Sequence, residues 1–353
     1  MSNERPPNEL PQHVALLVLH RLRVQNANAI SSPLTWGFPS ITAFTGLMTA
    51  LARRLGPDSG INFQSVGVVC HGFEAQVTQG GYTRSFCLTR NPVLQDGSTA
   101  AIVEEGRVHL DITLVFEVKL SSALLNDAAR AECATQIGEW VAGMRIAGGS
   151  VMPPLPSLAG MARGQPRAQL VLQAEDPDLR AKQFKRLCRQ WLPGFALVSR
   201  DDVLQSRLDA LRASAPEALP QPSLLDAWLD LSRINYRATT KTVWNDAGDA
   251  STEVVEWATD SRPGWLVPIP VGYAALSELH PPGTVSGARD ASVPFRFVES
   301  VYSIGQWISP HRFQDIGQLT WRAEYESTAG LYRCTNAYQA APTDTYTPVP
   351  FID

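Results

Sequence analysis

Histidine and carboxylate side chains are the first candidates for chemistry in this chain. The histidines that could act as bases or ligands, with the accompanying carboxylates, are His20, His71, His109, His311, Glu74, Glu104 and Glu105. His71 and Glu74 are three residues apart, which on a strand points them to opposite faces, so they cannot jointly hold a metal. The HExxH, GxSxG and GxxxxGKS/T motifs are absent. The pattern favours histidines that are packed or hydrogen-bonded in a core, and no metal or cofactor is expected.

The stretch from Gln25 to Pro39 combines amide, hydroxyl and aromatic side chains. Its members are Gln25, Asn26, Asn28, Ser31, Ser32, Thr35, Trp36 and Phe38. Amides can read base edges, hydroxyls contact phosphate or ribose, and aromatic rings stack on unpaired bases. The stretch also leads into a predicted helix N-terminus, which favours anions. An asparagine-rich turn with two aromatic rings packed on the core explains the same residues equally well.

A second candidate is the segment from Thr89 to Arg107. Turn residues at 91–92 and 96–97 lie between strand signals, with Arg90 and Arg107 on either side of them. This arrangement predicts a hairpin that projects from the fold with basic residues near its base. An ordinary surface hairpin is the alternative.

The segment from Pro177 to Leu192 predicts an amphipathic, strongly basic helix. Phe184, Leu187, Cys188 and Trp191 repeat at helical spacing on one face. The opposite face carries a set of cations, Lys182, Lys185, Arg186 and Arg189. This set is either a solvated surface or a stripe that meets phosphates, and the sequence alone does not decide between them.

The elements that must position these residues begin with strands and helices in alternation. A strand is predicted over 14–25, a loop over 26–39, and a helix over 41–55 with Ser40 as its cap and Gly56 at its end. Two strands are predicted within 63–79, around SVGVVC and FEAQVT, and further strands over 84–90 and 107–120. A helix from about 126 to 145 follows. This order fits the α+β class, as a ferredoxin-like β-α-β-β-α-β domain with inserted hairpins and an additional helical part.

The rest of the chain predicts a less regular organisation. Frequent Gly and Pro over 148–166 predict a linker or loop. Helices are predicted over 177–192, 201–213 and 223–234, and strands over 265–270 and 294–304. The polar segment 238–262 shows no periodicity and is interpreted as a mobile loop. We therefore expect a ferredoxin-like core with a projecting hairpin over 13–150, a helical part with mobile loops over 151–262, and C-terminal strands returning to the core over 263–353.

Composition narrows the class of protein. The chain has 353 residues, is 44% hydrophobic and 18% charged, and has a formal net charge of −4. These values indicate a globular protein, whereas a free-standing nucleic-acid binder is usually basic. The five cysteines are scattered without a CxxC pair, so neither a disulfide framework nor a zinc site is indicated and a reducing cytoplasm fits best. The apolar run 14–19 is too short to span a membrane, and no membrane contact is expected.

Several long blocks resemble one known family. They are RLRVQNANAISSPLTWGFPSITAFTGL (21–47), LTRNPVLQDGSTAAIVEEGR (88–107), GMRIAGGS (143–150), LPGFALVSR (192–200), PGWLVPIPVGYAALS (263–277) and SPHR (309–312). Together they resemble the second Csy subunit, a Cas5-like member of the RAMP superfamily found in type I-F CRISPR surveillance complexes. The blocks follow the family order over most of the chain, whereas 151–170 and 236–262 match poorly.

The resemblance implies a fold, a ligand and partners. It implies a modified RNA-recognition-type fold that binds the 5′ repeat-derived handle of the guide RNA, pairs with the large subunit and abuts the first copy of the repeated backbone subunit. Target DNA would be met only within the assembled complex. Guide processing belongs to a separate endoribonuclease in such systems, so the resemblance implies a subunit that is not an enzyme.

The side chains that we expect to contact RNA come from the three candidate regions. They are Arg23, Asn26, Asn28, Ser31, Ser32, Trp36, Phe38, Arg90, Arg107, Lys182, Lys185, Arg186 and Arg189. The glycine-rich loop that many superfamily members carry near the C-terminus is not evident, so no contact is assigned there. Two alternatives remain: a guide-processing endoribonuclease with His20 or His71 as base beside a Lys or Arg, and a purely structural partner of the large subunit.

Overall fold

The chain forms two compact units in a computed structural model that describes residues 13–90, 93–153, 167–215, 220–244, 251–260, 262 and 264–340. The first unit comprises Met1–Val198, Ile269–Val301 and Ile308–Tyr338, and the second comprises Ser199–Pro268, Tyr302–Trp307 and Gln339–Asp353. Strands β16 (Leu266–Ala275) and β17 (Val298–Ile308) run across the boundary between them in the sequence. The chain is therefore of the α+β class, with helices around a large, mainly antiparallel sheet.

The first unit is built on long strands that pair in an order different from their order in the chain. Its main strands are β1 (His13–Asn28), β4 (Ile61–Ala75), β9 (Arg107–Leu120), β10 (Arg145–Ile146), β11 (Gly149–Met152), β12 (Ala168–Leu172), β13 (Phe195–Ser199), β18 (Trp321–Glu326) and β19 (Leu331–Asn336). Four of them lie side by side as β12-β1-β9-β4, and each neighbouring pair is antiparallel. Strand β9 lies between β1 and β4, and its residues are buried along nearly its whole length, as expected of a central strand.

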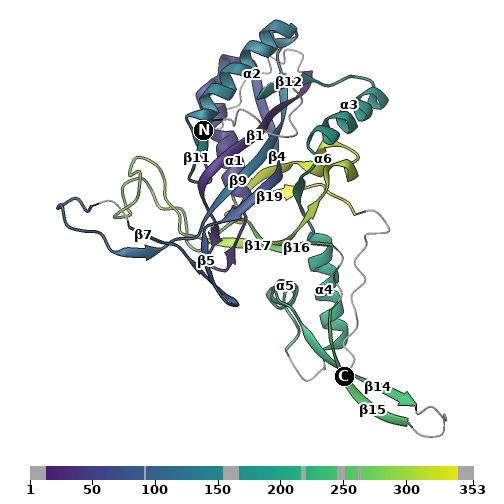
Figure 1. Cartoon of the computed structure of the whole chain (residues 1–353). Coiled ribbons are helices and arrows are strands. Elements are labelled where there is room, and N and C mark those ends of the chain that lie inside the picture. The colour runs from purple at the N-terminus through teal and green to yellow at the C-terminus, as the bar shows by residue number, and fades with distance from the viewer. Residues whose placement is uncertain are drawn as a thin grey trace. The chain divides into compact units, whose positions relative to one another are not determined.

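Helices cover both faces of this sheet, as Figure 1 shows with α1 (Ile41–Leu55) and α2 (Asp127–Ala142) on one side and α3 (Pro177–Gln190) on the other. Helix α1 begins as the sequence predicts, because the Ser40 side chain accepts a hydrogen bond from the Thr42 N–H. Its last turn meets α2, where the Arg54 guanidinium lies 5.0 Å from the centre of the Trp140 ring. Short helical turns complete the unit: η1 (Pro57–Ser59), η2 (Ser122–Leu124), η3 (Pro310–Arg312) and α6 (Ile316–Leu319).

The apolar face of α3 packs onto the sheet. Phe184 and Leu187 form one core with strand residues such as Val18 and Val115. Trp191, which follows the helix, is fully buried in the same core. The predicted amphipathic helix is thus confirmed, and its orientation leaves the basic face directed away from the sheet.

Strand β1 contains two β-bulges where it pairs with β9. Each includes one residue in the left-handed region, Arg21 with φ 49° and Asn26 with φ 56°. The backbone N–H groups at these positions are taken by side chains of β9: Arg21 N–H donates to Thr113 Oγ1 at 3.2 Å, and Asn26 N–H donates to His109 Nδ1 at 3.1 Å. Both backbone donors therefore keep a partner, the part-buried one at Arg21 and the exposed one at Asn26, although the strand carries extra residues.

Small hairpins surround the lower end of the sheet in Figure 1. They are formed by β2 (Ile30–Ser32) with β3 (Thr35–Trp36), β5 (Val77–Gly80) with β6 (Thr83–Phe86), and β7 (Leu88–Arg90) with β8 (Ile102–Glu104). The predicted projecting hairpin over 89–107 is thus present as β7 and β8. Residues 91–92 at its turn lie outside the described residues.

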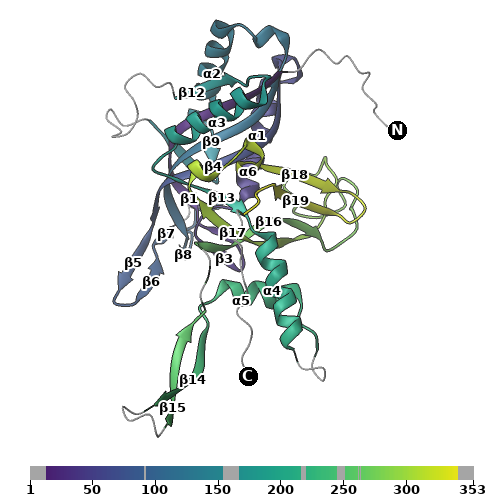
Figure 2. The same cartoon turned by 90° about the vertical axis from the view of Figure 1, so that its right-hand side faces the viewer.

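The second unit has its own core. Helices α4 (Asp201–Ser214) and α5 (Leu224–Ser232) pack through Leu208 and Trp228 with Ile304. A buried ion pair joins the two helices, with Arg207 Nε 2.6 Å from an Asp230 carboxylate oxygen. Strands β14 (Tyr236–Trp244) and β15 (Ser251–Thr259) form a two-stranded ribbon of this unit, seen at the bottom of Figure 2.

Three sequence predictions need correction or extension. The polar segment 238–262 is not a loop throughout, because β14 and β15 pair there residue for residue; it is rich in Thr, Val and Trp, which suit strands even when both faces are solvated. The loop predicted over 26–39 contains the β2–β3 hairpin, and β1 extends to Asn28. The segment 148–166 contains β11, and its residues 154–166 lie outside the described residues.

No helix within the described ranges is both long and apolar enough to cross a membrane.

Gly149 offers a direct test of this sheet. A Cβ at this position would lie 2.7 Å from the Ala27 nitrogen and 2.7 Å from the Gln25 carbonyl oxygen, beside the second bulge. Both atoms belong to the backbone and cannot turn away. We therefore expect Gly149→Ala to lower the free energy of unfolding by about 1–3 kcal/mol, measured as a fall in the thermal unfolding midpoint.

Gly46→Ala is the matched control. Gly46 lies exposed in α1, and a Cβ there would meet no atom within 4 Å. The change should leave the midpoint unchanged or raise it, because alanine favours a helix interior by up to about 1 kcal/mol over glycine. A Gly149→Ala variant that melts like the unmodified chain would contradict the close approach of β11 to β1.

Candidate nucleic-acid interface

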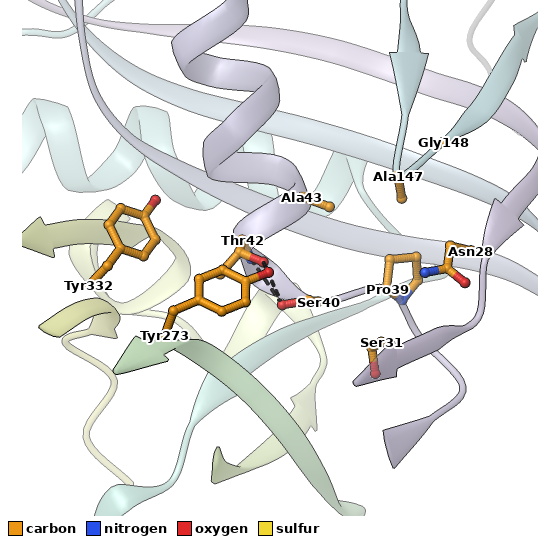
Figure 3. Close-up of a pocket in the computed structure, with 10 residues that line it drawn as sticks. All are labelled: Asn28, Ser31, Pro39, Ser40, Thr42, Ala43, Ala147, Gly148, Tyr273 and Tyr332. Atoms are coloured by element: carbon orange, nitrogen blue, oxygen red, sulfur yellow. Dashed lines mark hydrogen bonds between the residues drawn. The ribbon is translucent and has the colours of Figure 1, made fainter. Parts of the chain in front are cut away.

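A pocket of about 630 Å³ lies where β1 ends and α1 begins. Figure 3 shows the residues that line it: Asn28, Ser31, Pro39, Ser40, Thr42, Ala43, Ala147, Gly148, Tyr273 and Tyr332. Its volume lies in the usual range for sites that bind small molecules, roughly 300–1,000 Å³. The pocket brings together two of the residues selected from the sequence, Asn28 and Ser31, and joins them to groups from three distant segments.

The Asn28 side chain is held in one orientation at the pocket wall. Its Nδ2 donates to the Ile30 carbonyl at 2.8 Å, and its Oδ1 accepts from the Ile30 N–H at 3.1 Å. If the amide were reversed, its NH2 group would face the Ile30 N–H and its oxygen would face the Ile30 carbonyl. The two hydrogen bonds therefore fix which end of the amide carries the nitrogen. One N–H and one lone-pair site of the amide remain for another partner.

Hydroxyl groups shape the β2–β3 hairpin on the same side. Thr35 Oγ1 lies 2.8 Å from Ser31 Oγ and 2.6 Å from Ser32 Oγ, and Leu34 N–H donates to Ser32 Oγ at 3.2 Å. Ser32 is only 8% exposed. Its hydroxyl is therefore used within the hairpin, whereas Ser31 also reaches the pocket.

The turn between β10 and β11 closes another side of the pocket. Ala147 and Gly148 have φ values of 48° and 78°, as a tight hairpin turn requires. The Ala147 carbonyl accepts a hydrogen bond from the Asn28 N–H at 2.8 Å. The turn is thereby fixed to the end of β1.

Two tyrosines from C-terminal strands form the remaining wall and were not found from the sequence. Tyr273 on β16 lies opposite Tyr332 on β19, with ring centres 6.5 Å apart and planes 29° apart. The Tyr273 hydroxyl lies 3.5 Å from Thr42 Oγ1, and the Tyr332 hydroxyl lies 3.0 Å from Thr45 Oγ1. Burial raises the pKa of Tyr332 above its ordinary value, so this phenol stays neutral. Alternation of apolar and other residues along 266–275 could have indicated a strand. It cannot show which distant segment the outward-facing residues of that strand contact.

The aromatic residues of the predicted loop have different environments. Phe38 is half-buried and stacks on Phe44 of α1, with ring centres 5.7 Å apart. Trp36 is 45% exposed and contacts Phe86 of β6 with ring centres 5.9 Å apart. Neither ring lines the pocket, so Phe38 serves the core and only Trp36 keeps an open face.

The arginines predicted beside the loop lie in separate places. Arg23 lines a second pocket of about 440 Å³ on the sheet, together with His109 and Met152. Arg107 forms an ion pair with Glu105, with Nη2 and Oε2 3.0 Å apart, and its hydrogen bonds hold the pKa of Glu105 below its usual range. Asn26 is exposed beside this second pocket and binds His109 through its backbone. Arg90 ends β7, and its side chain lies outside the described part of the chain.

The basic face of α3 is fully available to solvent. Lys182, Lys185, Arg186 and Arg189 are all exposed, and none forms an ion pair with a carboxylate in the described ranges. Figure 2 places α3 away from β3, toward the other end of the sheet. The structure therefore does not join this face to the pocket as one compact site.

The two histidines considered as catalytic bases are engaged in the fold. His20 is 3% exposed, with Nε2 2.7 Å from the Gln169 side-chain amide. His71 lies between the Pro193 carbonyl, 2.7 Å from Nδ1, and Thr113 Oγ1, 2.8 Å from Nε2. Both ring nitrogens of His71 are thus occupied. Among the described residues no three His, Cys, Asp or Glu side chains gather as a metal site.

Burial of His20 predicts a pH dependence of stability. Burial, with a smaller effect of His71, lowers its pKa from 6.5 to about 4. Between these values the unfolded chain binds a proton that the folded chain does not, so the free energy of unfolding falls as pH falls from 6.5 toward 4. The contribution lost is at most about 3 kcal/mol. We expect His20→Gln to flatten the dependence of the unfolding midpoint on pH in this window.

His311→Gln serves as the control, because His311 is exposed and loses little solvation on folding. Its variant should follow the unmodified chain at every pH. If the unfolding midpoint depends on pH equally in His20→Gln and in the unmodified chain, His20 is not buried as a neutral ring.

Comparison with known proteins identifies relatives over almost the whole chain. The family model described as CRISPR-associated protein (Cas_Csy2) matches residues 17–334. The CRISPR-associated protein Csy2 of Pseudomonas aeruginosa (strain UCBPP-PA14) is 48% identical over 321 residues, which cover 90% of this chain and 94% of that protein. The matched range includes every segment that contributes to the pocket.

Proposed function

Because the chain belongs to the Csy2 family of CRISPR-associated proteins, we propose that it is a non-catalytic subunit of a type I-F surveillance complex that binds the 5′ handle of the guide RNA. The observation that carries the proposal is the pocket at the end of β1, where polar groups and tyrosine rings converge. Unpaired RNA is bound by this combination of hydrogen-bonding groups and aromatic faces. The selected residues Asn28 and Ser31 contribute to it.

The arrangement of the strands supports a ferredoxin-like core, as found in RNA-recognition domains. Strand β1 leads through α1 to β4, which returns as β9, and α2 leads on to β12. The spatial order β12-β1-β9-β4 corresponds to order 4-1-3-2 of a β-α-β-β-α-β domain. The hairpins and the second unit are then the modifications of that core.

The basic face of α3 supplies the electrostatic part of the proposal. Phosphate contacts bind any RNA, whereas selectivity comes from groups that meet the bases. Four exposed cations without described carboxylate partners suit the first role, and the uncharged pocket suits the second. With a net charge of −4, the rest of the chain repels RNA and leaves binding to such local surfaces.

Protein partners belong to the same proposal. We infer that the large subunit pairs with this chain, that the first backbone subunit abuts it, and that target DNA is met only in the assembled complex. Large apolar side chains exposed on the second unit support a protein interface: Leu225, Leu229, Ile234, Tyr236, Val255, Trp257 and Trp265. A two-stranded ribbon such as β14–β15 gains stability when another chain covers it.

Guide processing is not part of this function. A metal-free ribonuclease needs a base that reaches the 2′-hydroxyl. His20 is buried and both ring nitrogens of His71 have partners within the fold, which supports a binding role for the chain. The proposed mechanism is therefore recognition without cleavage.

The salt dependence of RNA binding tests whether α3 contacts phosphates while the pocket selects the handle. The unmodified chain should bind handle RNA more tightly than a scrambled RNA of equal length. Replacing Lys182, Lys185, Arg186 and Arg189 with alanine should weaken both affinities and reduce the slope of log K against log salt by about three, since each phosphate contact contributes roughly 0.7 for a single strand. The preference for the handle should remain.

A variant with four other exposed cations replaced by alanine, Arg53, Lys119, Arg212 and Arg289, controls for net charge. It should keep the original slope. An unmodified chain that binds handle and scrambled RNA equally would overturn the proposed function, and a slope that α3 does not change would remove α3 from the RNA path.

A further inference from the structure

The pocket at the start of α1 contains no formal charge. Among its ten lining residues the polar side chains are one amide, three aliphatic hydroxyls and two phenols. A phosphate placed inside would meet the N-terminus of α1 but no cationic side chain that offsets its lost hydration, which is unfavourable. The part of an RNA strand that suits the pocket is therefore neutral, namely a base with its ribose.

The walls offer the two contacts that an unpaired base needs. Tyr273 is 39% exposed and presents a ring face on one side of the pocket, while Asn28 lies on the other side, as Figure 3 shows. The Asn28 amide is fixed by its bonds to Ile30 and keeps one donor and one acceptor free. A donor beside an acceptor on a rigid group matches the edge of a base.

The Tyr273 ring has a firm support. Tyr332 lies directly across from it on β19, and Tyr325 lies across from Tyr332 on β18, so three rings form a row over neighbouring strands. Tyr332 is in turn hydrogen-bonded to Thr45 of α1. A ring held in this way loses little conformational freedom when a base stacks on it.

We propose that this pocket takes one unpaired nucleobase, with its ribose, turned out of the bound RNA strand, with Tyr273 stacking on the base and Asn28 bonding its edge. The inference rests on the proposed function, because it names the part of the RNA that the pocket receives. The phosphates on either side of this nucleotide remain outside, at the pocket mouth. Tyr273 and Asn28 are then selectivity residues that contact the ligand directly.

An abasic-site scan of the handle tests the proposal on the unmodified protein. Handle RNAs are prepared with a single abasic nucleotide at each position in turn, and their affinities are measured by fluorescence anisotropy. One position should lose roughly five- to 150-fold in affinity, the range expected for one base stacked on an aromatic ring. The loss should be the same at low and high salt, because the pocket is uncharged.

Variants then connect that position to the pocket. Tyr273→Ala should weaken binding of the intact handle by a similar factor. In this variant the abasic RNA and the intact handle should bind equally, because the base and the ring that it contacts lose the same interaction. Tyr273→Phe should bind nearly normally, because it retains the ring. Tyr82→Ala, which removes a fully exposed tyrosine between β5 and β6 that does not line the pocket, should match the unmodified chain.

The outcomes separate the two proposals. If the unmodified chain prefers the handle but no abasic position costs affinity, or the costly position stays costly in Tyr273→Ala, the base pocket is wrong while handle binding stands. A loss that disappears at high salt also overturns it, since contacts of a neutral base with an uncharged pocket do not depend on salt. If Tyr273→Ala fails to fold, Asn28→Ala takes its place: the abasic position should cost less affinity in that variant, and an unchanged cost would overturn the base pocket.

Discussion

The central constraint on this structure is that β1 must carry two extra residues while it stays paired with β9. At each bulge the strand loses a backbone partner, and a β9 side chain replaces it: Thr113 accepts from Arg21 N–H and His109 accepts from Asn26 N–H. Arg21 is also fixed by its ion pair with Asp111 between these two positions. Without Thr113 the part-buried Arg21 N–H would be unpaired within the sheet, at a cost of about 1–3 kcal/mol, whereas the exposed Asn26 N–H would turn to water.

The second bulge determines which residues face solvent at the site. Val24 points into the core, so an unbroken strand would direct residues 26 and 28 inward as well. The extra residue at Asn26 reverses this alternation, and Ala27 and Ala29 become buried while Asn28 becomes exposed. Asparagine tolerates the left-handed conformation that position 26 requires better than most residues. A backbone irregularity in a central strand therefore presents the amide that the pocket uses.

Local sequence patterns predicted the parts of this fold that local physics controls. Ser40 and Gly56 mark the ends of α1, and the alternation over 107–120 marks β9. The ribbon over 236–259 was missed because threonine and charged residues on both faces hide the period-two signal, although its β-branched residues favour strands. Tyr273 could not be placed at the site from the sequence, since the contact joins residues more than 200 positions apart in the chain.

We propose that the guide RNA handle meets the chain where β1 ends and α1 begins. Photo-crosslinking of handle RNA containing 4-thiouridine in the assembled complex, followed by mass spectrometry of the linked peptides, tests this claim directly. We expect crosslinks in peptides that contain residues 26–43 or Tyr273, the two segments that form opposite walls of the pocket. Crosslinks confined to other subunits, or to segments of this chain remote from the pocket, would contradict it.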